Sequence, residues 1–204
     1  MYSFCEVQHA NRDAMPSTLT PLSRSAAVCR LMGFTLIEAL VVLAVLGVLL
    51  SLAVPNLSNL YAKHQLQAQA EGLLDSLMMA RSEALKHQQP VTLCARAAAQ
   101  CDTQPNWQQG WWVFVDTNHN ARRDEGEALL EAREAFPLHM FLAANSTVKA
   151  YFSYGPDGRS QSPGGGFMAG TWRFCRSADA QGWQVVSNAL GQPRVEKYPV
   201  QQCP

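Results

Sequence analysis

The string GFTLIE at residues 33–38 runs directly into the apolar stretch ALVVLAVLGVLLSLAVP at residues 39–55. No charged residue occurs between Ala39 and Val54. With residues 34–37 added, this run has about the 20 residues that a helix needs to cross the ~30 Å hydrocarbon core of a bilayer. Only Glu38 interrupts it, and a carboxylate deep in a membrane costs on the order of 2.5 kcal/mol or more. The stretch predicts a membrane-spanning helix in which Glu38 is either a paired functional acid or an incidental acid near the interface.

The same string resembles the class III signal of type IV prepilins and pseudopilins, in which a glycine precedes Phe-Thr-Leu-Ile-Glu and an uninterrupted apolar helix. The resemblance implies that a prepilin peptidase cleaves between Gly33 and Phe34 and that the new amino group of Phe34 is methylated. It also implies that Glu38 pairs with the amino terminus of a neighbouring subunit inside a filament, because a buried carboxylate needs a cation. Pro55 stands where pilins have a helix-kinking proline, which removes a backbone donor and clashes one turn back.

The resemblance divides the chain into three parts. Residues 1–33 are expected to be a cleaved leader, in which Arg24 and Arg30 favour the cytoplasmic side of the membrane, and Met15 is an alternative start. Residues 34–56 are expected to form a transmembrane segment that becomes filament core. Residues 57–204 are expected to form a periplasmic pilin-like head. The expected location is therefore the bacterial inner membrane, as a single-pass protein, and the filament after assembly.

After Pro55 the sequence predicts an amphipathic helix over residues 57–88, which ends at Gln88-Gln89-Pro90. Its apolar residues recur at helical spacing, and the predicted stripe consists of Leu66, Ala70, Leu73, Leu74, Leu77, Ala84 and Leu85. Joined to the membrane segment, it gives one helix of roughly 50 residues.

Short β-prone segments separated by turns follow the helix. The expected strands are residues 91–95, 111–116, 128–132, 148–154, 171–175, 183–187 and 194–198. A long helix followed by antiparallel strands predicts an α+β fold. In the type IV pilin-like arrangement, the second half of the long N-terminal helix packs on the antiparallel β-sheet head.

The 204-residue chain has 16 Lys and Arg residues and 16 Asp and Glu residues, so its formal net charge is zero. This balance gives no global basic excess of the kind that indicates a nucleic-acid partner. The length allows one domain plus a membrane element. The sequence contains no HExxH pair, GxSxG elbow or phosphate-binding glycine loop, so an enzyme is not expected.

Four cysteines fall in the expected head: Cys94, Cys101, Cys175 and Cys203. In an oxidising periplasm an even number of cysteines indicates disulfides, and four cysteines allow three connectivities. The simplest pairs Cys94 with Cys101 and Cys175 with Cys203, and each bond contributes about 2–4 kcal/mol. The zinc alternative lacks any CxxC spacing.

Motifs in the head resemble the GspH/FimT family of minor pilins and pseudopilins. The matching segments are ARSEA at residues 80–84, VTLC at 91–94, GWWVFVDTN at 110–118 and VSNALG at 186–191. The resemblance spans nearly all of residues 33–194. It implies a minor subunit of a type IV pilus or of a type II secretion pseudopilus. Such a subunit acts in filament assembly or at the tip, and its partners are other pilin subunits.

The alternative from a different class is a DNA-uptake receptor for natural transformation. DNA-binding members of this family have a Gly-Arg-x-Arg string in the C-terminal tail, and the corresponding residues here are Gly191-Gln192-Pro193-Arg194. Because the first arginine is missing, only Arg194, with Lys197 nearby, is carried over as a phosphate contact. We expect at most weak, non-specific DNA binding.

Residues 116–127, DTNHNARRDEGE, resemble a twelve-residue calcium loop in the spacing of their oxygen atoms. The candidate ligands are Asp116, Asn118, Asn120, Asp124, Glu127 and the carbonyl of Arg122. However, Ala121 replaces the glycine of the sharp turn, two arginines oppose a dication, and the flanks are predicted strands. The same residues suit a plain hairpin turn. No cofactor is expected, with calcium as the alternative.

Overall fold

The computed structural model describes residues 35–97, 100–101, 106–137, 139–177 and 179–203, with only the backbone of residues 52–56, 97 and 100. The predicted cleavage site, Gly33 and Phe34, lies outside these residues. The chain forms two compact units, Met1–Gly47 and Val48–Pro204.

The single long helix, α1, runs from Leu36 to His87 and has 52 residues, which confirms the prediction of one helix of about 50 residues. Its backbone stays helical through Pro55. The helix ends after His87 because Gln88 adopts a left-handed φ of 54° and Pro90 follows two residues later.

In the first unit, the described part of α1 is apolar and exposed. Its large apolar side chains, from Leu36 to Leu46, are between 46 and 79% exposed. Within the parts of the chain that the structure describes, no helix reaches the length and hydropathy of a membrane span.

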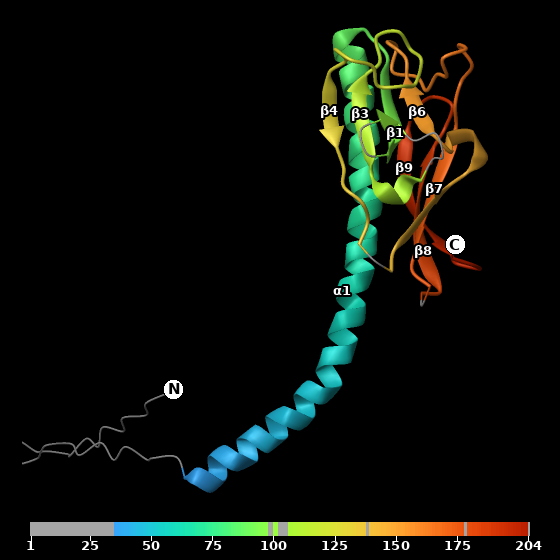
Figure 1. Ribbon diagram of the computed structural model, residues 1–204. Coiled ribbons are helices and arrows are strands. Elements are labelled where there is room, and N and C mark those ends of the chain that lie inside the picture. Colours follow the sequence, from blue (N-terminus) through green and yellow to red (C-terminus); the bar gives the residue numbers. More distant parts are fainter. Residues whose placement is uncertain (1–34, 98–99, 102–105, 138, 178, 204) are drawn as a thin grey trace, which may run out of the picture. The chain divides into compact units, whose positions relative to one another are not determined.

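In the second unit, α1 lies along the head (Figure 1), and one stripe of its side chains packs against the head. The buried stripe consists of Leu66, Ala70, Leu73, Leu77, Ala80 and Ala84, each at most 2% exposed. The spacing alternates between four and three residues, which places all six on one face. Two residues of the predicted stripe flank this face instead: Leu74 is half-buried and Leu85 is 45% exposed.

Two antiparallel sheets form the head (Figure 1). The first contains β1 (Val91–Ala97), β2 (Gln100–Cys101), β3 (Trp111–Val115), β4 (Leu129–Ala132) and β6 (Tyr151–Tyr154). Its order is β2-β1-β3-β4, and β6 also pairs with β1. The second sheet has the order β5-β7-β8-β9, with β5 at Phe141–Ala144, β7 at Gly170–Cys175, β8 at Gln181–Ser187 and β9 at Pro193–Pro199. The predicted α+β fold, a long N-terminal helix packed on antiparallel sheets, is confirmed.

The strand predictions were wrong in three places. Strands β2 and β5 were not predicted, and the strand predicted over residues 148–154 begins only at Tyr151. Val148 instead ends a short 3₁₀ helix, η2 (Ser146–Val148), and is fully buried. It packs so closely on Gly170 that a Cβ there would lie 2.3 Å from Val148 Cγ1. Val148 therefore fills the core instead of extending a sheet.

An aromatic cluster fills the core of the head. Trp172 of β7 makes edge contacts with Trp107 and Phe152, whose ring centroids lie 5.7 and 5.4 Å away. The indole N–H of Trp111 donates a hydrogen bond of 3.0 Å to Ser76 Oγ on α1. This bond satisfies a buried donor and joins the helix to β3.

Replacing Leu77 with alanine tests the packing of the helix stripe. Leu77 is fully buried, so Leu77→Ala should lower the free energy of unfolding by about 2–5 kcal/mol through lost burial and a residual cavity. The neighbouring Met78 is 55% exposed, and Met78→Ala should change the stability by less than about 0.5 kcal/mol. Thermal unfolding of the detergent-solubilised chain, followed by near-ultraviolet circular dichroism, gives both values. Equal effects would contradict the described face.

Candidate functional site

Glu38 lies in the first turn of α1. Its backbone N–H donates to Thr35 Oγ1 at 3.3 Å, so Thr35 caps the helix. Thr35-Leu36-Ile37-Glu38 matches the Thr-x-x-Glu pattern of a capping box, a signal in the sequence from which Thr35 could have been identified. The cap places the start of the helix two residues after Phe34, the predicted new amino terminus. Glu38 forms no ion pair with any other residue in the described ranges.

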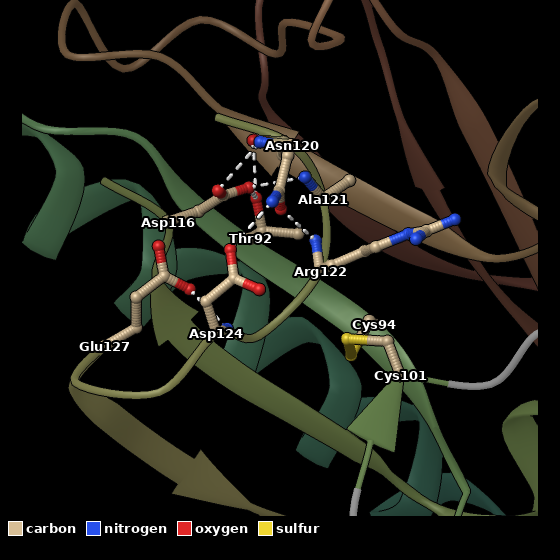
Figure 2. The surroundings of a disulfide bond; sticks show 10 residues. Thr92, Cys94, Cys101, Asp116, Asn120, Ala121, Arg122, Asp124 and Glu127 are labelled. Atoms are coloured by element: carbon tan, nitrogen blue, oxygen red, sulfur yellow. Dashed lines mark hydrogen bonds between the residues drawn. A yellow bond between two sulfur atoms is a disulfide. The ribbon is translucent and has the colours of Figure 1, made fainter. Parts of the chain in front are cut away.

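Both disulfides are present, with the simplest of the three pairings that the sequence allows. Cys94 and Cys101 have a Cα–Cα distance of 5.5 Å, and Cys175 and Cys203 have one of 5.9 Å. The first bond links β1 to β2 and is drawn in Figure 2. The second ties the segment after β9 to the end of β7, so the C-terminal tail is held on the second sheet.

Asp116 organises the loop that joins β3 to β4 (Figure 2). It is fully buried. Its Oδ1 accepts from the backbone N–H of Asn120 at 2.9 Å, and its Oδ2 accepts from the N–H of Ala121 at 2.9 Å and from Thr92 Oγ1 at 2.7 Å. Ala121 has a φ of 58°, so it adopts the left-handed conformation that usually favours glycine.

Glu127 closes the other side of this loop. Its Oε1 accepts from the backbone N–H and the hydroxyl of Thr117, at 2.8 and 3.0 Å. Its Oε2 accepts from the N–H of Asp124 at 2.9 Å. Both carboxylate oxygens therefore satisfy donors of the loop itself.

Asp124 Oδ2 accepts from the side-chain amides of Asn118 and Asn120, at 2.7 and 2.8 Å. These hydrogen bonds hold the pKa of Asp124 below its ordinary value, and the bond from Asn118 has the largest effect. A carboxyl group whose pKa is lowered by folding stabilises the fold above its unfolded pKa, and this contribution is lost as the pH falls through the folded pKa. The contribution of Asp124 is therefore complete at neutral pH and lost in acid.

The residues predicted as calcium ligands thus lie together, and hydrogen bonds among them close the loop between β3 and β4. In the described part of the chain, no group of three or more His, Cys, Asp or Glu residues is placed to hold a metal ion. Calcium binding stays a prediction, and any ion would have to compete with the hydrogen bonds to the three carboxylates.

The two residues predicted to contact DNA lie on β9 but do not face the same way. Successive side chains of a strand point to opposite faces, so Arg194 and Lys197 lie on opposite faces of the sheet. Arg194 Nε is 3.1 Å from Glu196 Oε2, whereas Lys197 Nζ lies 5.2 Å from the ring centroid of Trp183. Hydrogen bonds from Gln184 and then from Arg194 lower the pKa of Glu196, so the carboxylate that pairs with Arg194 is ionised at neutral pH.

Gly191, the other surviving residue of the family string, has a packing role. Its φ is 70°, and a Cβ there would lie 2.7 Å from Cε1 of Tyr154. A larger residue would therefore strain the turn between β8 and β9 and clash with a buried aromatic ring. This contact explains the glycine without DNA.

Replacing Asp116 tests the loop as a structural element. Asp116→Ala leaves the backbone N–H groups of Asn120 and Ala121 without their acceptor, so the free energy of unfolding should fall by about 3 kcal/mol. The matched control is Glu125→Ala, because Glu125 is an exposed acid of the same loop, and its removal should have an effect below about 0.5 kcal/mol.

The same unfolding measurements in calcium and in a calcium chelator separate the two interpretations of the loop. Since the carboxylates already bind the chain's own donors, the melting temperature of the wild type should be the same in both. A calcium-dependent rise that Asp116→Ala abolishes would instead establish a metal site.

Comparisons with known proteins show which family and which relatives the chain resembles. The family model described as type II transport protein GspH matches residues 69–191, more than half of the chain. The chain is 42% identical over 95 residues to the pilin-like protein PilA1 of Thermus thermophilus. That match covers 47% of this chain and 54% of PilA1, so the chain spans about half the length of this relative.

Among solved structures, two crystal forms of the type IV minor pilin FimU of Pseudomonas aeruginosa (strain PAO1) are similar to the chain. The P21 form has a TM-score of 0.49 at 20% identity and covers 70% of this chain and 95% of FimU. The P65 form has a TM-score of 0.46 at 21% identity and covers 68% and 97%. Because the family model matches from the second half of α1 to the turn before β9, the chain belongs to the GspH family of type II transport proteins.

Proposed function

We propose that this protein is a minor subunit of a type IV pilus or of a type II secretion pseudopilus, which helps to assemble the filament at or near its tip. The observation that supports this most directly is the first part of α1. It is an exposed apolar helix with one acid, Glu38, in its first turn, on a chain that belongs to the GspH family.

The exposed apolar surface of this helix needs a cover. Leu36 and Ile37 are 79 and 70% exposed, and apolar surface left in water costs about 25 cal/mol per Å². A bilayer covers it before assembly, and apolar helices of neighbouring subunits cover it in a filament core. Until assembly, the subunit therefore lies in the bacterial inner membrane, with the head in the periplasm.

The carboxylate of Glu38 supports the proposal that the neighbouring subunit in the filament is another processed pilin. In an apolar environment its carboxylate needs a cation, and it has no described ion-pair partner in its own chain. The amino terminus that a prepilin peptidase creates at Phe34 is such a cation on every subunit. Cleavage after Gly33 therefore generates both the free amine and the assembly-competent helix, and methylation of Phe34 follows.

DNA capture is the second function that the sequence suggests, and the arrangement of β9 gives it little support. Arg194 is paired with Glu196, and Lys197 lies on the other face. A single groove or phosphate backbone can therefore contact only one of the two through this strand. The structural role in the filament remains the better supported proposal.

Removing the charge of Glu38 tests the structural role. Glu38→Val and Glu38→Gln should leave the protein in the membrane, because both remove a desolvation cost. Their incorporation into filaments should fall at least tenfold, because the loss of a buried ion pair is worth well over the roughly 1.4 kcal/mol of a tenfold effect. Immunoblots of sheared filaments against membranes measure the ratio. The matched control is Glu71→Gln, an exposed acid farther along α1, which should incorporate normally. Wild-type incorporation of Glu38→Val would refute the pairing.

The DNA alternative has its own measurement. Binding of the purified chain to duplex DNA should be marginal, and Arg194→Ala should reduce the slope of log affinity against log salt by at most about 0.9, the value for one phosphate contact. Lys197→Ala should leave the DNA affinity and its salt slope unchanged, because Lys197 lies on the face opposite Arg194. Tight binding at moderate salt that needs both residues would contradict their placement on opposite faces.

A further inference from the structure

The second unit contains a pocket between α1 and the neighbouring ends of β8 and β9, with a volume of about 390 Å³. Its helical wall is formed by Leu60, Lys63, His64 and Gln67, which share one helix face at spacings of three, four and seven residues. The opposite wall includes Trp183 of β8 and Lys197 of β9. No role proposed so far explains this convergence of basic side chains on one cavity.

The charges around the pocket are unbalanced. Lys63 and Lys197 form no ion pair with a carboxylate in the described ranges. The acid that lines the pocket, Asp179, is neutralised by Arg176, which donates from Nε at 3.1 Å and from Nη2 at 2.9 Å. The pocket therefore has two uncompensated positive charges, and the imidazole of His64 adds a hydrogen-bonding group beside them.

The remaining walls suit a small organic anion better than a bare ion. The indole of Trp183 and the side chain of Leu60 provide apolar surface. Lys197 Nζ lies 5.2 Å from the centroid of the Trp183 ring, which holds this cation at the wall of the pocket. The side-chain amide N–H of Gln67 donates a hydrogen bond to Glu71 at 2.8 Å. The carbonyl oxygen of Gln67 is therefore able to accept a hydrogen bond from a hydroxyl group of the ligand.

We propose that this pocket binds a phosphate ester with a short polar alcohol, as in the glycerol phosphate headgroup of an anionic phospholipid. Two lysines supply charge to the phosphate oxygens, and the lysines and His64 supply hydrogen-bond donors. The glutamine amides of the walls supply partners for the hydroxyl groups. Lysine side chains close to a membrane surface attract anionic lipid headgroups through the same charge pairing.

The lipid source rests on the proposed membrane anchor, whereas the phosphate site itself does not. Lys63 follows the apolar stretch that ends at Val54 by about nine residues, or two and a half turns of helix. Between them, Leu57, Leu60 and Tyr61 are 66, 52 and 68% exposed, and tyrosine is enriched at membrane interfaces. A subunit anchored by α1 would therefore hold this pocket at the level of the lipid headgroups.

The test uses the full chain in an uncharged detergent and four probes. Native mass spectrometry measures binding of phosphatidylglycerol and phosphatidylcholine, and calorimetry measures binding of glycerol 3-phosphate and inorganic phosphate. Phosphatidylglycerol should bind saturably and more tightly than the net-neutral phosphatidylcholine. The double variant Lys63→Gln, Lys197→Gln should bind phosphatidylglycerol about 25-fold more weakly, since each lysine contributes about fivefold.

The matched control is the double variant Lys86→Gln, Lys149→Gln, which removes two exposed lysines outside the pocket and should bind as the wild type does. Binding of glycerol 3-phosphate as tight as that of phosphatidylglycerol, lost in the pocket variant, would support the phosphate site and assign it to a soluble ester. No saturable binding of any probe, or equal binding by the pocket variant, would overturn the site.

One further outcome separates a lipid from a protein occupant. If the pocket variant binds the phosphate probes as the wild type does but no longer enters filaments, an acidic segment of a neighbouring subunit occupies the pocket, and the phosphate site is overturned. The binding measurements do not involve Glu38. A failure of the filament proposal would therefore appear in the Glu38 experiment alone.

Discussion

The packing of one stripe of α1 on the sheets is the contact on which the rest of the structure depends. The stripe repeats at alternating steps of four and three residues and is completely buried. Leucines at positions 73 and 77 fill the core, and alanines at positions 70 and 80 let the head approach the helix closely. The hydrogen bond from Trp111 to Ser76 adds a directed contact. Without this face the helix would lose its tie to the head.

The same helix has two different environments along its length, and this division gives the fold its proposed use. Before the stripe, α1 has exposed apolar side chains and one acid; within the stripe, its apolar side chains are covered by its own head. The first part therefore needs an external cover, and the second does not. Two disulfides and the hydrogen-bonded loop after β3 stabilise the head itself.

The sequence predicted what local patterns determine. Helical periodicity predicted α1 and its end, and the cysteine spacing favoured the observed pairing. The opposite faces of Arg194 and Lys197 also follow from strand alternation, because the two residues are three positions apart on one strand. Long-range packing determined the rest. Valine is a residue type typical of strands, but the side chain of Val148 occupies the core space that Gly170, which has no side chain, leaves open. The pocket beside Lys63 joins residues more than a hundred positions apart, so no local pattern could predict it.

We propose that the chain is processed into a filament subunit whose helix begins at the residues around Thr35. The most direct measurement is the intact mass of the wild-type protein from membranes of cells with an active prepilin peptidase, together with the mass of its N-terminal peptide. The wild-type chain should start at Phe34 with one methyl group on its amino terminus, and a Gly33→Leu variant should keep residues 1–33. A wild-type protein that retains residues 1–33 in those cells would contradict this processing.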